Sequence, residues 1–113
     1  MKITLTVDGT PCAAVIDPGE CLMDVLRRVG KTSVKNGCDR GDCGSCAVLL
    51  DGRAVNACLV FAAQVDGSEI RTVEGLEGAS GLHPLQFTAL DGGAVQCGFC
   101  TPGMLMAATA LLA

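Results

Sequence analysis

The 113-residue chain contains no tryptophan, no tyrosine and a single histidine, and aromatic residues make up only 3% of it. A core built from this sequence must therefore pack leucine, valine, alanine and methionine instead of aromatic rings. Positive charge is also scarce, because 8 Lys and Arg residues face 12 Asp and Glu residues and leave a net charge of −4. This deficit argues against nucleic acid or an anionic membrane surface as the main partner.

Long hydrophobic runs are missing as well. The most apolar segment is residues 102–113, about a dozen residues, whereas a helix that spans a bilayer needs roughly 20. Residues 1–7 alternate between polar and apolar and do not read as a signal peptide. We therefore expect no membrane span and a cytoplasmic location, in which the 8 cysteines stay reduced instead of forming a disulfide framework.

Cysteine itself is plentiful, and four of the cysteines follow the spacing Cys38-x4-Cys43-x2-Cys46-x11-Cys58. The x4–x2 spacing is that of plant-type [2Fe–2S] proteins, in which four thiolates complete the ligand set of the cluster. A structural zinc site is the alternative, but zinc ribbons favour two Cys-x2-Cys pairs roughly 15–20 residues apart. Glycines at positions 37, 41 and 44 suit a loop that turns its backbone N–H groups toward sulfur. The pattern therefore predicts a one-electron carrier.

A second cysteine motif lies in Gln96–Gly103, where Cys97 and Cys100 form a Cys-x2-Cys pair. Thr101 suits the N-cap of a following helix and Pro102 suits its first position. Two thiolates make only half of a cluster site, and core thiols or a redox-active disulfide are the alternatives for this pair. The two remaining cysteines, Cys12 and Cys21, are expected to be small buried residues without a role.

The first part of the chain predicts a β-grasp arrangement, a mixed sheet curled over one helix. Apolar residues alternate with polar ones, and Asp-Gly turns follow at residues 8–9 and 51–52. Leu22, Val25, Leu26 and Val29 recur at helical spacing up to Gly30. The strands are predicted at 3–7, 12–16, 46–50, 53–57 and 69–72. The second hairpin brings Cys46 and Cys58 to the same open end.

The remainder of the chain lacks the alternation of apolar and polar residues that is typical of strands. Residues 74–81 form a Gly-rich stretch without periodicity, and we place a domain boundary there. Helices are predicted from Pro84 to the Gly92–Gly93 pair and over residues 102–113. The predicted domains are therefore residues 1–74, a β-grasp unit, and residues 75–113, a partial helical unit.

Within the predicted helices, Leu85, Ala89 and Leu90 are expected to face inward, and Met104 and Met106 are expected to fill the core. The second of these helices is apolar on nearly every side, so it is either buried all round or lacks its neighbours. Exposed apolar surface of this kind predicts an interface with a partner.

Several polar residues near the motifs are expected to be structural or solvated and not catalytic. His83, beside Pro84, is expected to be a helix-entry residue and not a catalytic base. Gln86 reads as a solvated polar side chain. Asp39, Arg40 and Asp42 read as solvated loop charges, with tuning of the cluster or contact with a partner as the alternative.

Taken together, the two motifs make the chain resemble the small iron–sulfur subunit or domain of the molybdenum hydroxylases, the xanthine dehydrogenase and aldehyde oxidoreductase family. The resemblance covers nearly the whole chain, and finding both motifs in this order is highly specific. The segments that carry the resemblance are residues 32–38, 41–46, Cys58, 83–86 and 96–104. It implies an α+β fold with a plant-type ferredoxin-like β-grasp domain, followed by an all-α helical domain. Each of the two domains binds one [2Fe–2S] cluster in that family.

The resemblance also implies a function. It assigns Cys38, Cys43, Cys46 and Cys58 to one cluster and Cys97 and Cys100 to the other, and it places the residue matching Gln96 against molybdopterin. Electrons then pass from the molybdenum cofactor through the clusters to a flavin or another acceptor. The expected partners are a large molybdopterin-binding subunit and a medium FAD-binding subunit. The chain itself belongs to an oxidoreductase but does not convert the substrate, because no residue in it reads as base, nucleophile or molybdenum ligand.

The sequence departs from the family pattern in one respect. The family completes its second cluster with a Cys-x-Cys pair a few tens of residues after the Cys-x2-Cys motif, and these 113 residues contain no such pair. We expect that the sequence is a truncated form of a longer polypeptide or that the second cluster is absent. Two rival functions stay open at this point: a free-standing [2Fe–2S] ferredoxin, and a structural zinc or thiol module.

Overall fold

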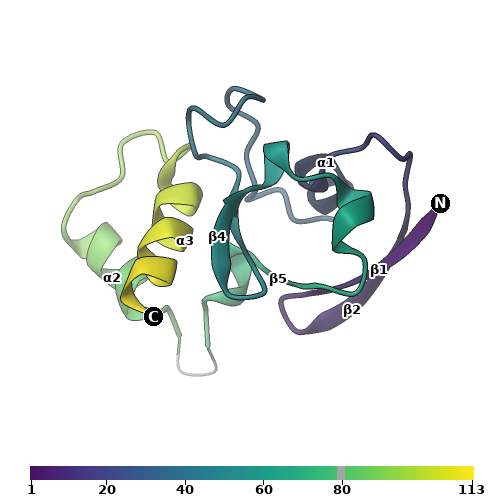
Figure 1. The fold of residues 1–113 in the computed structure, drawn as a ribbon. Helices are drawn as coiled ribbons and strands as arrows, with labels where there is room; N and C mark the ends of the chain where they lie inside the picture. The colour runs from purple at the N-terminus through teal and green to yellow at the C-terminus, as the bar shows by residue number, and fades with distance from the viewer. Residues whose placement is uncertain (79–80) are drawn as a thin grey trace.

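The computed structural model describes residues 1–78 and 81–113. A curled sheet with its covering helix α1 forms one side of the molecule, and two helices, α2 and α3, form the other (Figure 1). The two ends of the chain lie far apart, with the N-terminus beyond the sheet and the C-terminus at the end of α3. Within the described residues, no helix is long and apolar enough to cross a membrane.

The first hairpin joins β1 (Lys2–Val7) to β2 (Thr10–Val15) through the turn Asp8–Gly9. The two strands pair antiparallel, and Leu5 lies opposite Cys12. Ile3, Leu5 and Val7 are buried, whereas the residues between them are exposed or half-buried, because successive side chains point to opposite faces of a strand. The alternation seen in the sequence therefore becomes the inner face of the sheet.

A second hairpin joins β3 (Ala47–Leu50) to β4 (Arg53–Asn56), and β5 (Glu69–Arg71) is inserted between the two hairpins. The strand order is β2-β1-β5-β3-β4. Strands β1 and β5 run parallel, and the other pairs run antiparallel. This mixed sheet curled over one helix is the predicted β-grasp arrangement, and the prediction is confirmed.

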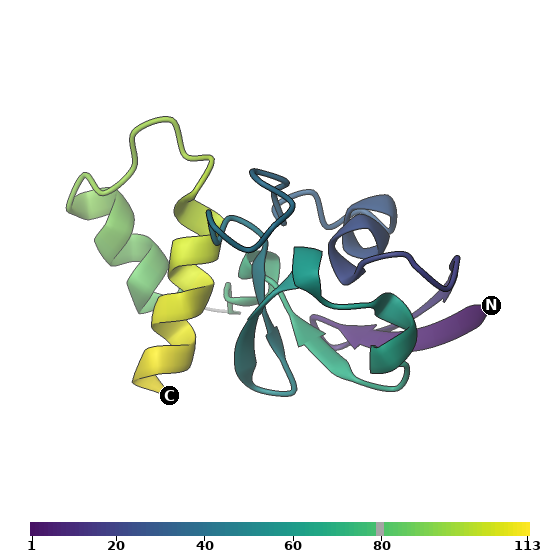
Figure 2. The same ribbon diagram turned by 45° about the horizontal axis from the view of Figure 1, so that its top comes forward.

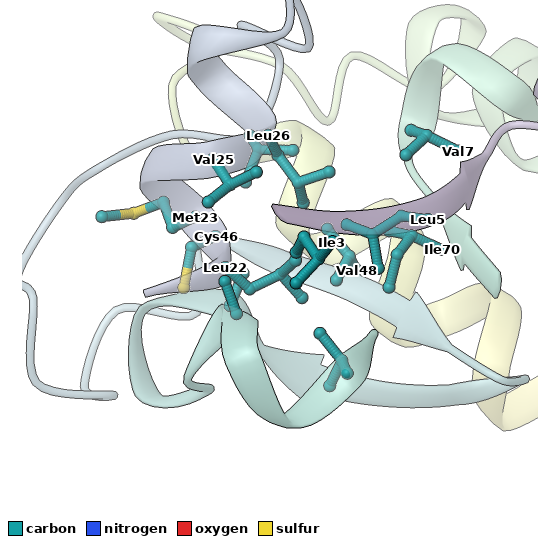
Figure 3. Packing of buried hydrophobic residues seen from close by; sticks show 14 of the residues in the cluster. Ile3, Leu5, Val7, Leu22, Met23, Val25, Leu26, Cys46, Val48 and Ile70 are labelled. Atoms are coloured by element: carbon teal, nitrogen blue, oxygen red, sulfur yellow. The ribbon is translucent and has the colours of Figure 1, made fainter. Parts of the chain in front are cut away.

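Helix α1 (Leu22–Arg28) buries one face against the sheet (Figure 3). Leu22, Met23, Val25 and Leu26 are at most 1% exposed, and burial of each such side chain contributes about 1.5–3 kcal/mol. Cys46 belongs to the same core cluster, at 3% exposed. One of the four cysteines of the first motif is thus anchored in the hydrophobic core.

Helices α2 (Pro84–Asp91) and α3 (Thr101–Leu112) follow the sheet. Helix α3 packs on β3 through Met106, which is 1% exposed and clusters with Leu49 and Leu76. Its other side is open: Met104 is 62% exposed, and Leu111 and Leu112 are exposed too. Helix α3 also contacts α2, but part of its apolar surface stays exposed within this chain.

Some sequence predictions need correction at the level of single residues. Leu90 and Met104 were expected inside but are both 62% exposed, whereas Met106 is buried as predicted. The N-cap of α3 is Cys100, and Thr101 is already helical. Cys12 and Cys21 are only half-buried.

The predicted element ends also shift by one or two residues, because the last residues of an element are held weakly by its ladder of hydrogen bonds. Residue 2 joins β1, residues 10–11 join β2 while residue 16 falls outside it, and residue 29 falls outside α1. Residues 46 and 57 fall outside the second hairpin, and residue 72 falls outside β5. A 3-10 turn over residues 73–75 overlaps the start of the predicted linker 74–81, of which residues 79 and 80 lie outside the described part of the chain.

Candidate metal centre

The first cysteine motif lies on the long loop between α1 and β3 and on the end of the second hairpin. In Figure 2 this loop rises above the hairpin and comes close to the start of α3. Cys38 and Cys43 are on the loop, Cys46 directly precedes β3, and Cys58 lies in the 3-10 turn after β4. The residues opposite each other at the hairpin's open end, Ala47 and Asn56, hold Cys46 and Cys58 at neighbouring positions.

Backbone N–H groups of the loop and hairpin point at the cysteine sulfurs. The amides of Asp42 and Cys43 donate to Cys38 Sγ at 3.2 and 3.3 Å. The Ser45 amide donates to Cys43 Sγ at 3.4 Å, and the Cys58 amide donates to Cys46 Sγ at 3.4 Å. Donors aimed at sulfur favour the thiolate form and offset the negative charge that a ligating sulfur carries.

The sulfurs interact in two pairs. Backbone N–H groups, that of Arg40 first, together with the Cys43 side chain lower the pKa of Cys38 to about 7. Burial, together with the neighbouring Cys46 side chain, raises the pKa of Cys58 to about 11, and Cys38 also acts on it through space. A pKa of about 7 makes a substantial fraction of Cys38 thiolate at neutral pH, whereas Cys58, with its raised pKa, must lose a proton when a metal binds.

The space around Cys43 is shaped by Gly37. A Cβ atom added at Gly37 would lie 2.7 Å from Cys43 Sγ, so any other residue at position 37 would displace that sulfur. Within the part of the chain that the structure describes, no three His, Cys, Asp or Glu side chains are grouped around a single ion position. Two sulfur pairs fit the ligand set of a [2Fe–2S] cluster, which has two irons and four cysteines. The residues present therefore fit this cofactor.

Three residues that sequence reasoning did not single out support the loop. Asn56 Nδ2 donates to the Gly41 carbonyl at 3.4 Å, and Leu59 packs so closely on Gly41 that a Cβ there would lie against its side chain. Ser45 is 3% exposed and its carbonyl accepts from the Lys35 amide at 3.2 Å. Only Asn56 could have been suspected from the sequence, because it lies two residues before the predicted ligand Cys58.

The second cysteine motif lies on the connection between α2 and α3. Cys97, Cys100 and Gln96 are all exposed, and the described residues place no other cysteine in this segment. All eight cysteines of the chain are free thiols. The structure thus places the first four cysteines on the cluster loop and the neighbouring hairpin end, and the later two on the connection between α2 and α3.

His83 is the N-cap residue of α2, so the prediction that it lies at the entry of a helix is confirmed. His83 Nδ1 accepts from the Leu85 amide at 3.1 Å, and Gln86 Oε1 accepts in return from the His83 amide at 2.9 Å, which makes a capping box. Gln86 Nε2 also donates to the Val73 carbonyl at 3.3 Å. Gln86 is therefore not simply solvated, because it fastens α2 to the turn that follows β5.

The loop charges lie at the surface, as predicted. Arg40 and Asp42 form an ion pair of 2.9 Å, with side chains 77% and 71% exposed. Asp39 accepts from Asn36 Nδ2 at 3.2 Å and has a positive φ of 59°.

Comparison with known families decides what this architecture is. Residues 5–71 match the family described as 2Fe-2S iron-sulfur cluster binding domain, and residues 72–113 match the [2Fe-2S] binding domain family. The chain is 49% identical to the xanthine dehydrogenase iron-sulfur-binding subunit of Escherichia coli O157:H7, covering 100% of this chain and 71% of that subunit. The chain belongs to the iron–sulfur subunits of the molybdenum hydroxylase family.

Other relatives place this iron–sulfur subunit in two kinds of assembly. It is 44% identical to the aldehyde oxidoreductase of Megalodesulfovibrio gigas over 96% of its own length, but it spans only 12% of that much longer chain. The crystal structure of quinoline 2-oxidoreductase from Pseudomonas putida 86 superposes with a TM-score of 0.95 at 44% identity, covering 99% of this subunit and 70% of that chain. The family therefore includes both separate subunits and domains of larger polypeptides.

The family and the fold establish the role of this chain at a coarse level. It is an electron-transfer component of an oxidoreductase, and its relatives work as parts of larger molybdenum enzymes. The α+β fold, with a ferredoxin-like part and a second [2Fe–2S] part, agrees with the prediction.

Proposed function

We propose that Cys38, Cys43, Cys46 and Cys58 hold one [2Fe–2S] cluster and that this chain transfers electrons within a molybdenum hydroxylase. The observation that carries the proposal is the meeting of the four sulfurs in two pairs, with N–H donors from Asp42, Cys43, Ser45 and Cys58. The bound cluster accepts and releases single electrons. The chain's part is to hold the thiolates, to stabilise their charge through backbone dipoles and to set the potential.

The second site is proposed at Cys97 and Cys100, in a helical domain comprising residues 75–113. The match of residues 72–113 to a [2Fe-2S] binding family supports it. Two thiolates leave two ligand positions to be filled, so the proposal requires two further ligands from outside these residues. Gln96 is exposed beside Cys97, and we assign its side-chain amide to a hydrogen bond with molybdopterin.

The partners proposed are a molybdopterin-binding large subunit and an FAD-binding subunit, present as separate chains or as domains of one chain. Electrons from the molybdenum cofactor enter on the helical side and leave from the β-grasp side toward the flavin or another acceptor. The exposed apolar residues of α3, Met104, Leu111 and Leu112, support a covered interface in the assembly. A cytoplasmic location is part of the proposal, because cysteines that ligate a metal must stay reduced, and the cytosol keeps thiols reduced.

The proposal is tested on the complex purified anaerobically in its native form. Size-exclusion chromatography should place this chain with a larger molybdenum-containing subunit, and reduced protein should give the rhombic spectrum of one-electron [2Fe–2S] centres. A monomeric chain with one cluster and no partner would instead indicate a free ferredoxin. A colourless chain with stoichiometric zinc would indicate a structural zinc module.

A further inference from the structure

Two glycines bring the two cysteine-bearing parts of the chain into backbone contact. Gly103, in the first turn of α3, is buried against the backbone of the loop that carries Cys43. A Cβ atom at position 103 would lie 2.1 Å from the Gly44 carbonyl oxygen and 3.0 Å from Ser45 Cα. Both neighbours are backbone atoms, so neither can turn aside as a flexible side chain would. Only glycine at position 103 permits this packing.

Each glycine lies within a few residues of a cysteine motif. Gly44 separates Cys43 from Cys46 in the loop, and the next amide, that of Ser45, donates to Cys43 Sγ at 3.4 Å. The Gly44 carbonyl also accepts from the Ala47 amide at 3.1 Å, which fixes the peptide that Gly103 touches. Gly103 follows Cys100 by three residues, on a helix that Cys100 caps. The backbones of the two motifs are thus in direct packing contact at Gly103 and Gly44.

The rest of α3 holds the helix at this distance. Met106, one turn further along the same face, is 1% exposed and packs on Leu49 of β3 and on Leu76. Because Met106 anchors the middle of the helix, a side chain at position 103 would tilt the first turn away from the loop. Cys100 would move with that turn.

We propose that Gly103 is a positioning residue that sets the separation and electronic coupling of the two cysteine sites. The inference rests on the proposed function, because it needs a cluster at each site. It assigns to the Gly103–Gly44 contact a direct backbone connection between the two cysteine-bearing segments. Replacing Gly103 by alanine should leave both ligand sets intact while moving Cys100 away from Cys43.

The decisive experiment compares the native holoenzyme with holoenzymes that carry Gly103→Ala or Gly19→Ala in this chain. Gly19 is the matched control, since a Cβ there meets nothing within 4 Å and its φ is not in the left-handed region. Electron paramagnetic resonance of the fully reduced proteins should show magnetic interaction between the two clusters in the native and Gly19→Ala forms. Gly103→Ala should retain the iron and sulfide content but show a weaker interaction. An unchanged interaction with full iron content overturns the inference.

A second measurement decides the matter if Gly103→Ala fails to assemble. The 113-residue chain carrying Cys97→Ala and Cys100→Ala would be labelled with ¹³C-glycine and loaded with the cluster at Cys38, Cys43, Cys46 and Cys58. On reduction, the Gly103 resonance should broaden together with that of Gly44, while that of Gly19 stays sharp. A sharp Gly103 resonance overturns the inference and leaves the proposed function standing. Absence of any [2Fe–2S] signal from the native holoenzyme overturns the proposed function, and this inference with it.

Discussion

The carboxylate of Asp8 holds Thr72 with two hydrogen bonds of 2.7 Å, one from the Thr72 amide and one from its hydroxyl. Thr72 is fully buried, and the Asp8 side chain is 8% exposed and also pairs with Lys31 Nζ at 3.3 Å. The contact ties the turn of the first hairpin to the residue that directly follows β5. It therefore fixes the point at which the chain leaves the sheet for the helices.

The first prediction concerns this contact. Asp8→Ala leaves two buried donors of Thr72 without a partner and should lower the free energy of unfolding by about 2–4 kcal/mol. The matched control is Asp51→Ala, because Asp51 also precedes a glycine in a hairpin turn with positive φ, at 48° against 50° for Asp8. Asp51 accepts a single exposed bond, from the Glu69 amide, so its loss should cost about 1 kcal/mol or less. Equal losses in urea titrations would contradict the prediction.

The second prediction concerns the ligand set. Cys43→Ala removes one thiolate of the first sulfur pair and should abolish the spectrum of the cluster in the β-grasp domain. Alanine is the better replacement, since a serine alkoxide can take the place of a thiolate. Cys12→Ala is the control, because Cys12 lies on β2, away from the cluster loop, and should leave the spectrum unchanged. A Cys43→Ala protein with the full spectrum would show that the ligand assignment is wrong.

The third prediction concerns the space beside Cys43. Gly37→Ala keeps all four cysteines but places a methyl group 2.7 Å from Cys43 Sγ, so the sulfur must move. We expect lower iron content per chain and a shifted midpoint potential in the fraction that binds a cluster. Gly19→Ala again provides the control in open space. Native iron content together with a native midpoint potential would contradict the prediction, because it would mean that the loop backbone shifts and leaves Cys43 Sγ in place.

The fourth prediction is a pH dependence away from the metal site. Hydrogen bonding from Arg28 lowers the pKa of Glu20 below its ordinary value of 4.5. Arg28 also donates to the Val15 carbonyl at 2.9 Å, so the pair fastens the end of β2 to α1. Because the folded protein favours the charged carboxylate, the stabilisation is complete above pH 4.5 and is lost as the pH falls through the lowered pKa.

Glu20→Gln should therefore be slightly less stable than the parent protein at neutral pH, with a gap that closes in acid. The effect is small because the Arg28 side chain is 47% exposed and salt screens the pair. Urea titrations between neutral pH and pH 3 measure the gap directly. A gap that grows as the pH falls would contradict the assignment of the shift to Arg28.

Local patterns predicted much of this fold and of its first site. Strand β1 was readable because Ile3, Leu5 and Val7 alternate with polar residues, and helix α1 because its apolar residues recur at helical spacing. The spacing of Cys38, Cys43, Cys46 and Cys58 was informative because ligand geometry constrains the distance between ligands along a loop. These patterns depend on residues that are close together in the chain, so they can be recognised from the sequence alone.

The helical side was less predictable for a physical reason. Helix α3 is apolar on nearly every side, so its pattern does not indicate which residues face the sheet. Met104 and Met106 look alike in the sequence, but packing on Leu49 buries only Met106. In α2 the same ambiguity placed Leu90 inside, although it is exposed.

The sequence by itself determined the order of elements in the β-grasp and the spacing of the cysteines, because these depend on local periodicity, and its two cysteine motifs carried the resemblance to the family. Only the tertiary structure decided which sulfurs pair, which amides face them and why position 103 is glycine. Those features depend on contacts between residues far apart in the chain. The Gly103–Gly44 contact and the Asp8–Thr72 hydrogen bonds exist only once the chain has folded back on itself.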